Sequence, residues 1–133
     1  MSTTPIQSSS LTTPLLAGAA LSNITPPLGI SLDGPIGQNG PATHIHDELH
    51  ARCLVLSNGS TTIGIAVCDS TMIGEHIFAA AKGLVAEHTG LPPGNLMMTA
   101  THSHSVPRGI SITDAPLFQE YLEFLSQRIA DGI

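Results

Sequence analysis

The segment ARCLVLSNGSTTIGIAVCD, Ala51 to Asp69, decides the fold because two β-rich runs flank a turn signal in it. The dipeptide Asn58-Gly59 supplies the positive φ angles of a tight hairpin. We therefore predict two antiparallel strands that meet at this turn. The second run, Ile63 to Cys68, is apolar almost throughout, which is typical of a strand covered on both faces.

A helix and a further strand are expected directly after this hairpin. Apolar residues recur at helical spacing from about Met72 to His88, and Ser70 or Thr71 is placed to cap the helix start. The run NLMMTAT, Asn95 to Thr101, follows as a short buried strand. Strand, helix and strand then form a right-handed β-α-β crossover in a mixed sheet.

The segments outside this unit provide one more strand, a long loop and a last helix. LLAGAALSNIT, residues 15–25, is expected to form the first strand, and the Gly- and Pro-rich residues 26–42 exclude a regular element. Thr113 or Asp114 is placed to cap the last helix. Its apolar face carries Phe118, Tyr121, Leu122, Leu125 and Ile129.

The predicted fold class is therefore α/β, with elements in the order β-β-β-α-β-α. It is a mixed β-sheet with a β-hairpin and a β-α-β crossover, flanked by helices. Residues 1–14 are rich in Ser, Thr and Pro and are expected to form a flexible leader. Residues 15–133 then form one domain.

Charge and hydropathy exclude several classes of protein. The chain has 133 residues, with 4 basic and 10 acidic side chains and a formal net charge of −6. The basic residues are scattered and form no stripe for a phosphate backbone, so nucleic-acid binding is not expected. No apolar run approaches the roughly 20 residues that cross a bilayer, so we expect no transmembrane segment. The start of the chain lacks the basic residues of a secretory signal, which favours a cytoplasmic location.

Two cysteines, Cys53 and Cys68, lie on neighbouring predicted strands. This placement is compatible with a disulfide and with two buried free thiols. Free thiols are the more common outcome in an apolar context.

The segment TATHSHSVPRG, Thr99 to Gly109, places two histidines at the end of a predicted strand. Residues i and i+2 of an extended segment point the same way, so His102 and His104 are predicted to face one cavity. Asp69 and His102 both follow parallel strands at their carboxyl ends, where ligands usually bind. Neutral imidazole is a common metal ligand, but H-x-H is equally compatible with histidines that merely cap a strand. Catalytic zinc takes about three protein ligands and a water, so further ligands are required.

Three other parts of the chain contain candidates for the same site. The polar run THIHDELHAR, residues 43–52, could approach the metal or the substrate, and the pair His46-Asp47 is the first to test. A solvated loop is the more common outcome for any one residue there. Asp69 either orients an imidazole or a metal-bound water, or caps the following helix. Arg108 could pair with an anionic group of a substrate, although an exposed arginine beside a proline is usually solvated.

Three segments together resemble the N-terminal part of the catalytic domain of the neutral/alkaline (non-lysosomal) ceramidase family. AGAALSNITPPLG, residues 17–29, is similar to an opening strand of that family followed by D-I-T-P-P-L-G. HDELHARCLVLSNG, residues 46–59, is similar to H-D-x-L-x-A-R-x-L-V-L. HTGLPPGNLMMTATHSHSVP, residues 88–107, is similar to T-G-I-P-x-x-N-V-x-x-x-x-T-H-T-H-S-G-P. The match runs from about Leu16 to the C-terminus with its spacing intact.

The resemblance implies a zinc-dependent amidase that cleaves a lipid-like N-acyl amide into a fatty acid and an amine such as sphingosine. Zinc in such enzymes polarises the amide carbonyl and activates water. The first histidine of T-H-T-H, here His102, is implied to be a direct zinc ligand. The second, His104, is implied to lie in the active site in a supporting or substrate-contacting role. Val106 stands where the family has Gly, which predicts a reshaped loop.

The resemblance further implies that another His, a Glu and a Tyr complete the metal site from regions beyond Ile133. We therefore expect the first part of a catalytic domain, from a fragment or a truncated gene product. It would work with the remainder of that domain or in a homo-oligomer. The alternative is a non-catalytic remnant or binding module that keeps the fold. A barrel amidohydrolase ranks last, because strands precede the H-x-H pair and too little chain follows it.

Overall fold

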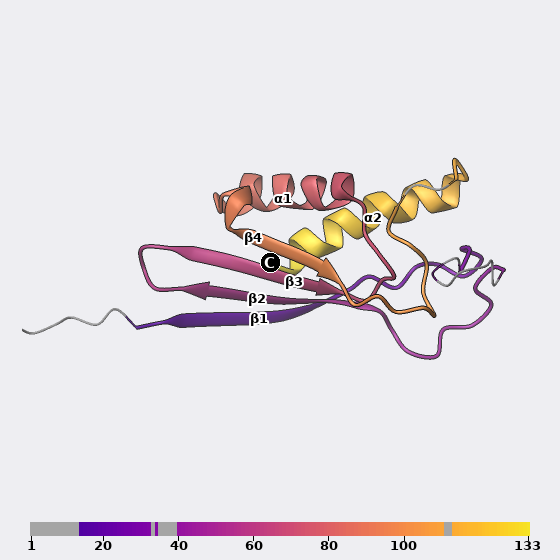
Figure 1. The fold of residues 1–133 in the computed structure, drawn as a ribbon, viewed down its shortest axis with the longest axis horizontal. Coiled ribbons are helices and arrows are strands. Elements are labelled where there is room, and N and C mark those ends of the chain that lie inside the picture. Colours follow the sequence, from indigo (N-terminus) through magenta and orange to yellow (C-terminus); the bar gives the residue numbers. More distant parts are fainter. Residues whose placement is uncertain (1–13, 33, 35–39, 111–112) are drawn as a thin grey trace, which may run out of the picture.

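Four strands and two α-helices make up the computed structural model, which describes residues 14–32, 34, 40–110 and 113–133 (Figure 1). The strands lie in the sheet order β1-β2-β3-β4. The elements are β1 (Leu16–Asn23), β2 (His50–Ser57), β3 (Thr62–Cys68), α1 (Glu75–Thr89), the short 3-10 helix η1 (Pro93–Asn95), β4 (Leu96–Ala100) and α2 (Pro116–Gly132). The predicted fold class and element order are confirmed. The expected leader falls almost wholly outside the described residues.

The β2–β3 hairpin forms as predicted, but its turn differs from the predicted one. The last pair of the register joins Ser57 to Thr62, which leaves residues 58–61 as the loop. The side-chain oxygen of Asn58 accepts hydrogen bonds from the backbone N–H groups of Ser60 and Thr61, at 3.1 and 2.8 Å. Gly59 has a φ of 85°, whereas Asn58 has no positive φ. The positive φ expected at Asn58 was therefore wrong and that at Gly59 is confirmed, because the Asn58 side chain stabilises a four-residue loop.

Strands β3 and β4 are parallel and are joined through α1, which confirms the predicted crossover. Helix α1 begins later than expected, with Gly74 as its N-cap and no side-chain cap. Ser70 and Thr71 do not cap it, because their hydroxyls bond to backbone carbonyls of the segment after β4. Helix α2 likewise starts after Ala115 without a side-chain cap, so the cap predicted at Thr113 or Asp114 was wrong.

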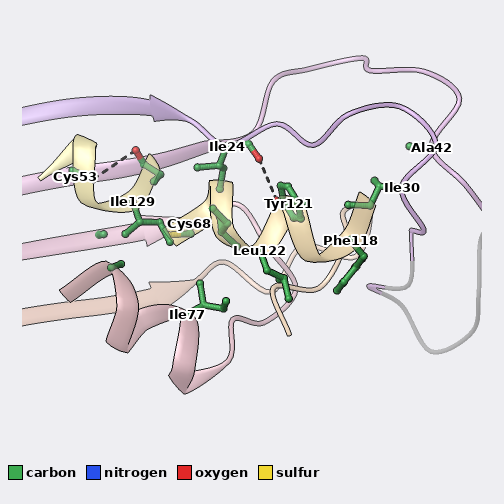
Figure 2. Packing of buried hydrophobic residues seen from close by; sticks show 14 residues of the cluster. Ile24, Ile30, Ala42, Cys53, Cys68, Ile77, Phe118, Tyr121, Leu122 and Ile129 are labelled. Atoms are coloured by element: carbon green, nitrogen blue, oxygen red, sulfur yellow. Dashed lines mark hydrogen bonds between the residues drawn. The ribbon is translucent and has the colours of Figure 1, made fainter. Parts of the chain in front are cut away.

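Both helices lie on the same side of the sheet, and the core fills the space between them and the strands (Figures 1 and 2). The predicted apolar face of α2 is buried in this core, and Leu125 and Ile129 are fully enclosed. The phenol of Tyr121 donates a hydrogen bond of 3.2 Å to the carbonyl of Ile24, which ties α2 to the chain after β1 (Figure 2). Among the described residues, no helix is both long enough and apolar enough to cross a membrane.

The other face of the sheet remains open in the described chain. Leu54 pairs with Ile65, and Ile65 pairs with Met97, so these three side chains share that face. Large apolar side chains are exposed on it, with Leu21 at 67%, Leu54 at 37%, Ile63 at 40% and Met97 at 57%. The expectation that β3 is covered on both faces and the expectation that β4 is buried were therefore wrong for the described chain, because its two helices pack on one side of the sheet only.

The two cysteines are free thiols, and both are buried under α2 on the covered face. Burial raises the pKa of the Cys53 thiol above its ordinary value. Burial, and to a smaller extent the neighbouring Cys53 and Asp69, raises the pKa of Cys68 to about 12. The core therefore keeps both sulfur atoms protonated and out of reach of solvent at neutral pH.

We predict that neither thiol reacts with an aromatic disulfide reagent in the folded chain at pH 8, and that both react in urea. Because folding raises the pKa of Cys68 above the unfolded value of about 8.5, the folded state holds its proton more tightly. The contribution of this thiol to stability is thus complete below about pH 8.5 and is lost as the pH rises toward 12. Thiol titration and unfolding curves across this range test both points, with Cys53→Ala to assign the signals. Rapid labelling of the native chain would contradict them.

Candidate metal centre

The two histidines follow β4 and lie against the segment that follows β3. The backbone N–H of Thr101 donates to the carbonyl of Cys68 at 2.9 Å, and that of His102 donates to the carbonyl of Ser70 at 3.0 Å. These bonds hold the two segments side by side beyond the last residues of the ladder. The structure thus brings His102 to the carboxyl end of the parallel pair, as the sequence predicts.

The ring of His102 is fixed by one hydrogen bond. Its Nδ1 lies 2.8 Å from the carbonyl oxygen of Thr71. A carbonyl oxygen only accepts, so Nδ1 carries the proton in this contact, and Nε2 of the neutral ring keeps its lone pair. A second-shell carbonyl of this kind is the usual partner of a metal-binding imidazole.

The backbone of His102 is strained. Its φ is 62°, the one positive φ among the described non-glycine residues. Left-handed backbone costs a residue with a side chain roughly 1–2 kcal/mol, and such strain concentrates at functional sites. The bonds of the surrounding segment therefore hold a conformation that His102 would not adopt by itself.

The ring of His104 lies next to that of His102, as predicted from the H-x-H spacing. The two Nε2 atoms are 3.4 Å apart, and the ring centroids are 4.9 Å apart. The reason differs from the expected one, because β4 ends at Ala100 and the left-handed turn at His102 brings the rings together. Two Zn–N bonds of about 2.0–2.1 Å at a tetrahedral angle place their nitrogens about 3.4 Å apart. The same distance also fits a hydrogen bond in which Nε2–H of His104 donates to the lone pair on Nε2 of His102.

Ser70 and Thr71 anchor the loop that carries the histidines. The Ser70 hydroxyl lies within donating distance of two carbonyls, that of Met72 at 3.1 Å and that of Pro107 at 3.2 Å. The Thr71 hydroxyl donates to the carbonyl of Ser103 at 2.6 Å. Both residues are buried, at 1% and 3% exposure. The sequence suggested only helix caps here, because no local pattern reports a contact with residues more than thirty positions away.

Val106 has a buried side chain, at 2% exposure, and its backbone is not left-handed. Its carbonyl oxygen lies so close to Gly34 that a Cβ on that glycine would overlap it. The β-branched side chain of Val106 is thus accommodated because it is buried in the protein interior.

Asp69 forms hydrogen bonds with residues at the beginning of β2. Both of its carboxylate oxygens accept hydrogen bonds from Arg52 Nη1, at 2.7 and 2.6 Å. One of them also accepts from the backbone N–H of His50 at 3.0 Å. Since α1 begins at Glu75, six residues further on, with Gly74 as its N-cap, the helix-cap alternative for Asp69 was wrong. Its proposed catalytic role stays a prediction.

The polar run before β2 meets the histidine loop across a pocket of about 340 Å³. His46 contributes to its wall, together with Asp47, Ser103, Ser105 and the apolar Leu32 and Val106. Nδ1 of His46 is 2.9 Å from the carboxylate of Asp47, and both side chains are highly exposed. Arg108 is half-buried just after this loop. His46 therefore shares a pocket with Ser103 and Ser105, whereas His102 and His104 are not among the residues that line it.

The described part of the chain holds no complete metal site. Among residues 14–32, 34, 40–110 and 113–133, no group of three or more His, Cys, Asp or Glu side chains could hold a metal ion. If His102 is a metal ligand, as the resemblance implies, its further partners lie outside the described residues.

Comparisons with solved structures identify the same arrangement of strands and helices. The chain is similar to a crystal structure of neutral ceramidase from Pseudomonas aeruginosa, with a TM-score of 0.69 and 20% identity over 90% of this chain. It is also similar to a ceramidase complexed with C2, with a TM-score of 0.69 and 23% identity over 91% of this chain. It spans 21% and 20% of these two chains. No family model and no curated protein matches the sequence.

These likenesses show that the chain has the fold of one part of neutral ceramidase. The resemblance read from the three sequence segments is therefore confirmed for the fold. Metal content, activity and substrate are not fixed by a likeness at this level of identity.

The strain at His102 leads to a prediction about stability. Both His102→Gly and His102→Ala remove the bond to Thr71, but only glycine adopts a positive φ without steric cost. We expect His102→Gly to be more stable than His102→Ala by about 1 kcal/mol in urea unfolding. At the neighbouring Ser105, where φ is not positive, the order should reverse, with Ser105→Ala the more stable. Equal stabilities of the two His102 variants would contradict a strained turn.

Proposed function

We propose that this chain supplies His102 and the adjoining part of the active site of a zinc-dependent amidohydrolase. The substrate would be a lipid-like N-acyl amide, as in ceramide. The observation that carries the proposal is the ring of His102, whose Nδ1 bonds to a carbonyl while Nε2 faces Nε2 of His104. The fold shared with neutral ceramidase supports it.

Each residue has a distinct role in this proposal. His102 would hold zinc through Nε2, and bound zinc supplies Lewis acidity toward an amide carbonyl and an activated water. His104, exposed and adjacent, would orient the reacting groups and hold or release a proton at Nε2. Asp69 would act at a distance, by fixing Arg52 and the backbone at His50 so that the ends of β2 and β3 stay together.

The pocket beside the histidine loop is the proposed binding site for the substrate. Its wall combines apolar side chains such as Leu32 and Val106 with the polar His46 and Ser105. An amide that carries an acyl chain needs both kinds of surface. His46 is proposed to contact the polar part of the substrate, and Arg108 to contact an anionic group near the loop.

We propose that the remaining metal ligands come from polypeptide outside these 133 residues. The chain spans about a fifth of each ceramidase that it resembles. The open sheet face, with Leu21, Leu54, Ile63 and Met97 exposed, offers apolar surface for such a polypeptide. We also propose that the protein is cytoplasmic.

Zinc content separates the roles of the two histidines. In the complete catalytic protein we expect near-stoichiometric zinc by elemental analysis and loss of most of it in His102→Ala. His104→Ala should keep zinc and lose about 10²–10⁴-fold in kcat. His88→Ala, an exposed histidine on α1, serves as the control and should change neither quantity. Unchanged zinc in His102→Ala would overturn the assignment.

The second candidate, a remnant that keeps the fold without chemistry, rests on the two-donor site. It predicts no hydrolysis of an N-acyl amine by the complete protein when loaded with zinc. The proposed hydrolase predicts turnover that stops on chelation and returns when zinc is restored. The same assay therefore decides between the two.

A further inference from the structure

Thr71 makes two contacts with the histidine loop through two different atoms. Its carbonyl oxygen accepts from Nδ1 of His102 at 2.8 Å. Its hydroxyl donates to the carbonyl of Ser103, the next residue, at 2.6 Å. Neither atom takes part in the start of α1, whose N-cap is Gly74.

The hydroxyl of Thr71 is enclosed. The residue is 3% exposed, and the backbone of Gly34 lies so close that a Cβ there would overlap the Thr71 hydroxyl. Water cannot readily replace a donor in such a place. Without the hydroxyl, the Ser103 carbonyl would lose its hydrogen-bond donor, and the histidine loop would move away from Thr71.

The position of this contact matters because His102 is strained. The backbone N–H of His102 bonds to the Ser70 carbonyl on one side, and the Thr71 hydroxyl holds Ser103 on the other. These two bonds bracket the residue whose φ is 62°. If the second is lost, His102 is released toward ordinary backbone angles and its ring moves away from the Thr71 carbonyl.

We propose that Thr71 is the positioning residue that sets the tautomer of His102. Its hydroxyl holds the strained turn, and the turn keeps Nδ1–H on the Thr71 carbonyl, which leaves the lone pair on Nε2. A histidine released from this contact reverts to the Nε2–H tautomer that free imidazole side chains favour. That tautomer has no lone pair at Nε2, the atom that faces His104. The link to zinc rests on the proposed function, whereas the tautomer does not.

Imidazole ¹⁵N NMR of the 133-residue chain at pH 8 tests the proposal, because an unperturbed imidazole is neutral there. We expect Nδ1–H at His102 in the wild type and in Thr71→Ser, which keeps the hydroxyl. In Thr71→Val, which has the same shape without the hydroxyl, Nε2–H should predominate. A purely structural role would lower the urea midpoint of Thr71→Val without changing the tautomer, and that result overturns the proposal.

Zinc affinity, measured against a chelator on the complete catalytic protein with the same substitutions, gives a second readout. We expect Thr71→Val to bind Zn²⁺ about 10–100-fold more weakly than the wild type and Thr71→Ser to match the wild type. If the wild type binds no zinc but shows Nδ1–H, the proposed function fails and the tautomer inference stands. If Thr71→Val does not fold, the wild type and Thr71→Ser decide: Nε2–H in either overturns the inference.

Discussion

The structure of the site depends on the hydrogen bonds between the chain after β3 and the chain after β4. Parallel strands end at the same edge of a sheet, but their ladder stops at Cys68 and Ala100. Beyond it, the carbonyls of Cys68 and Ser70 accept from the backbone of Thr101 and His102. These contacts extend the alignment of β3 and β4 into the loops that follow them. They also hold His102 in its strained backbone conformation. The positions of both imidazole rings follow from them.

Much of the fold could be predicted from the sequence because its signals are local. The β-rich runs around Asn58-Gly59 and the helical spacing of the α2 face identify elements that the structure contains. The errors arose where a side chain had a distant partner. Ser70 and Thr71 are good helix caps by type, yet Pro107 and Ser103 take their hydroxyls. The apolar character of β3 predicted a strand covered on both faces, but the described chain covers only one of them.

The candidate site was predictable in part for the same reason. The spacing of His102 and His104 predicts that the two side chains point the same way, and in the structure their rings lie next to each other. The left-handed turn that causes the meeting has no sequence signature, since glycine or asparagine would normally mark such a position. The pairing of Asp69 with Arg52 joins residues 17 positions apart, and no spacing rule connects them. Long-range contacts of this kind are set by the sheet as a whole.

His102 and His104 lie side by side at the edge of a sheet that the described chain covers on one face only. We propose above all that Nε2 of His102 is a metal ligand, and that the hydrogen bond from Nδ1 to the Thr71 carbonyl orients the ring. Anomalous X-ray diffraction from crystals of the complete protein grown with zinc tests this most directly. The account predicts a zinc peak about 2.0–2.1 Å from Nε2 of His102, with Nδ1 still on the Thr71 carbonyl. A zinc peak elsewhere, with the His102 ring turned away from it, would contradict the account.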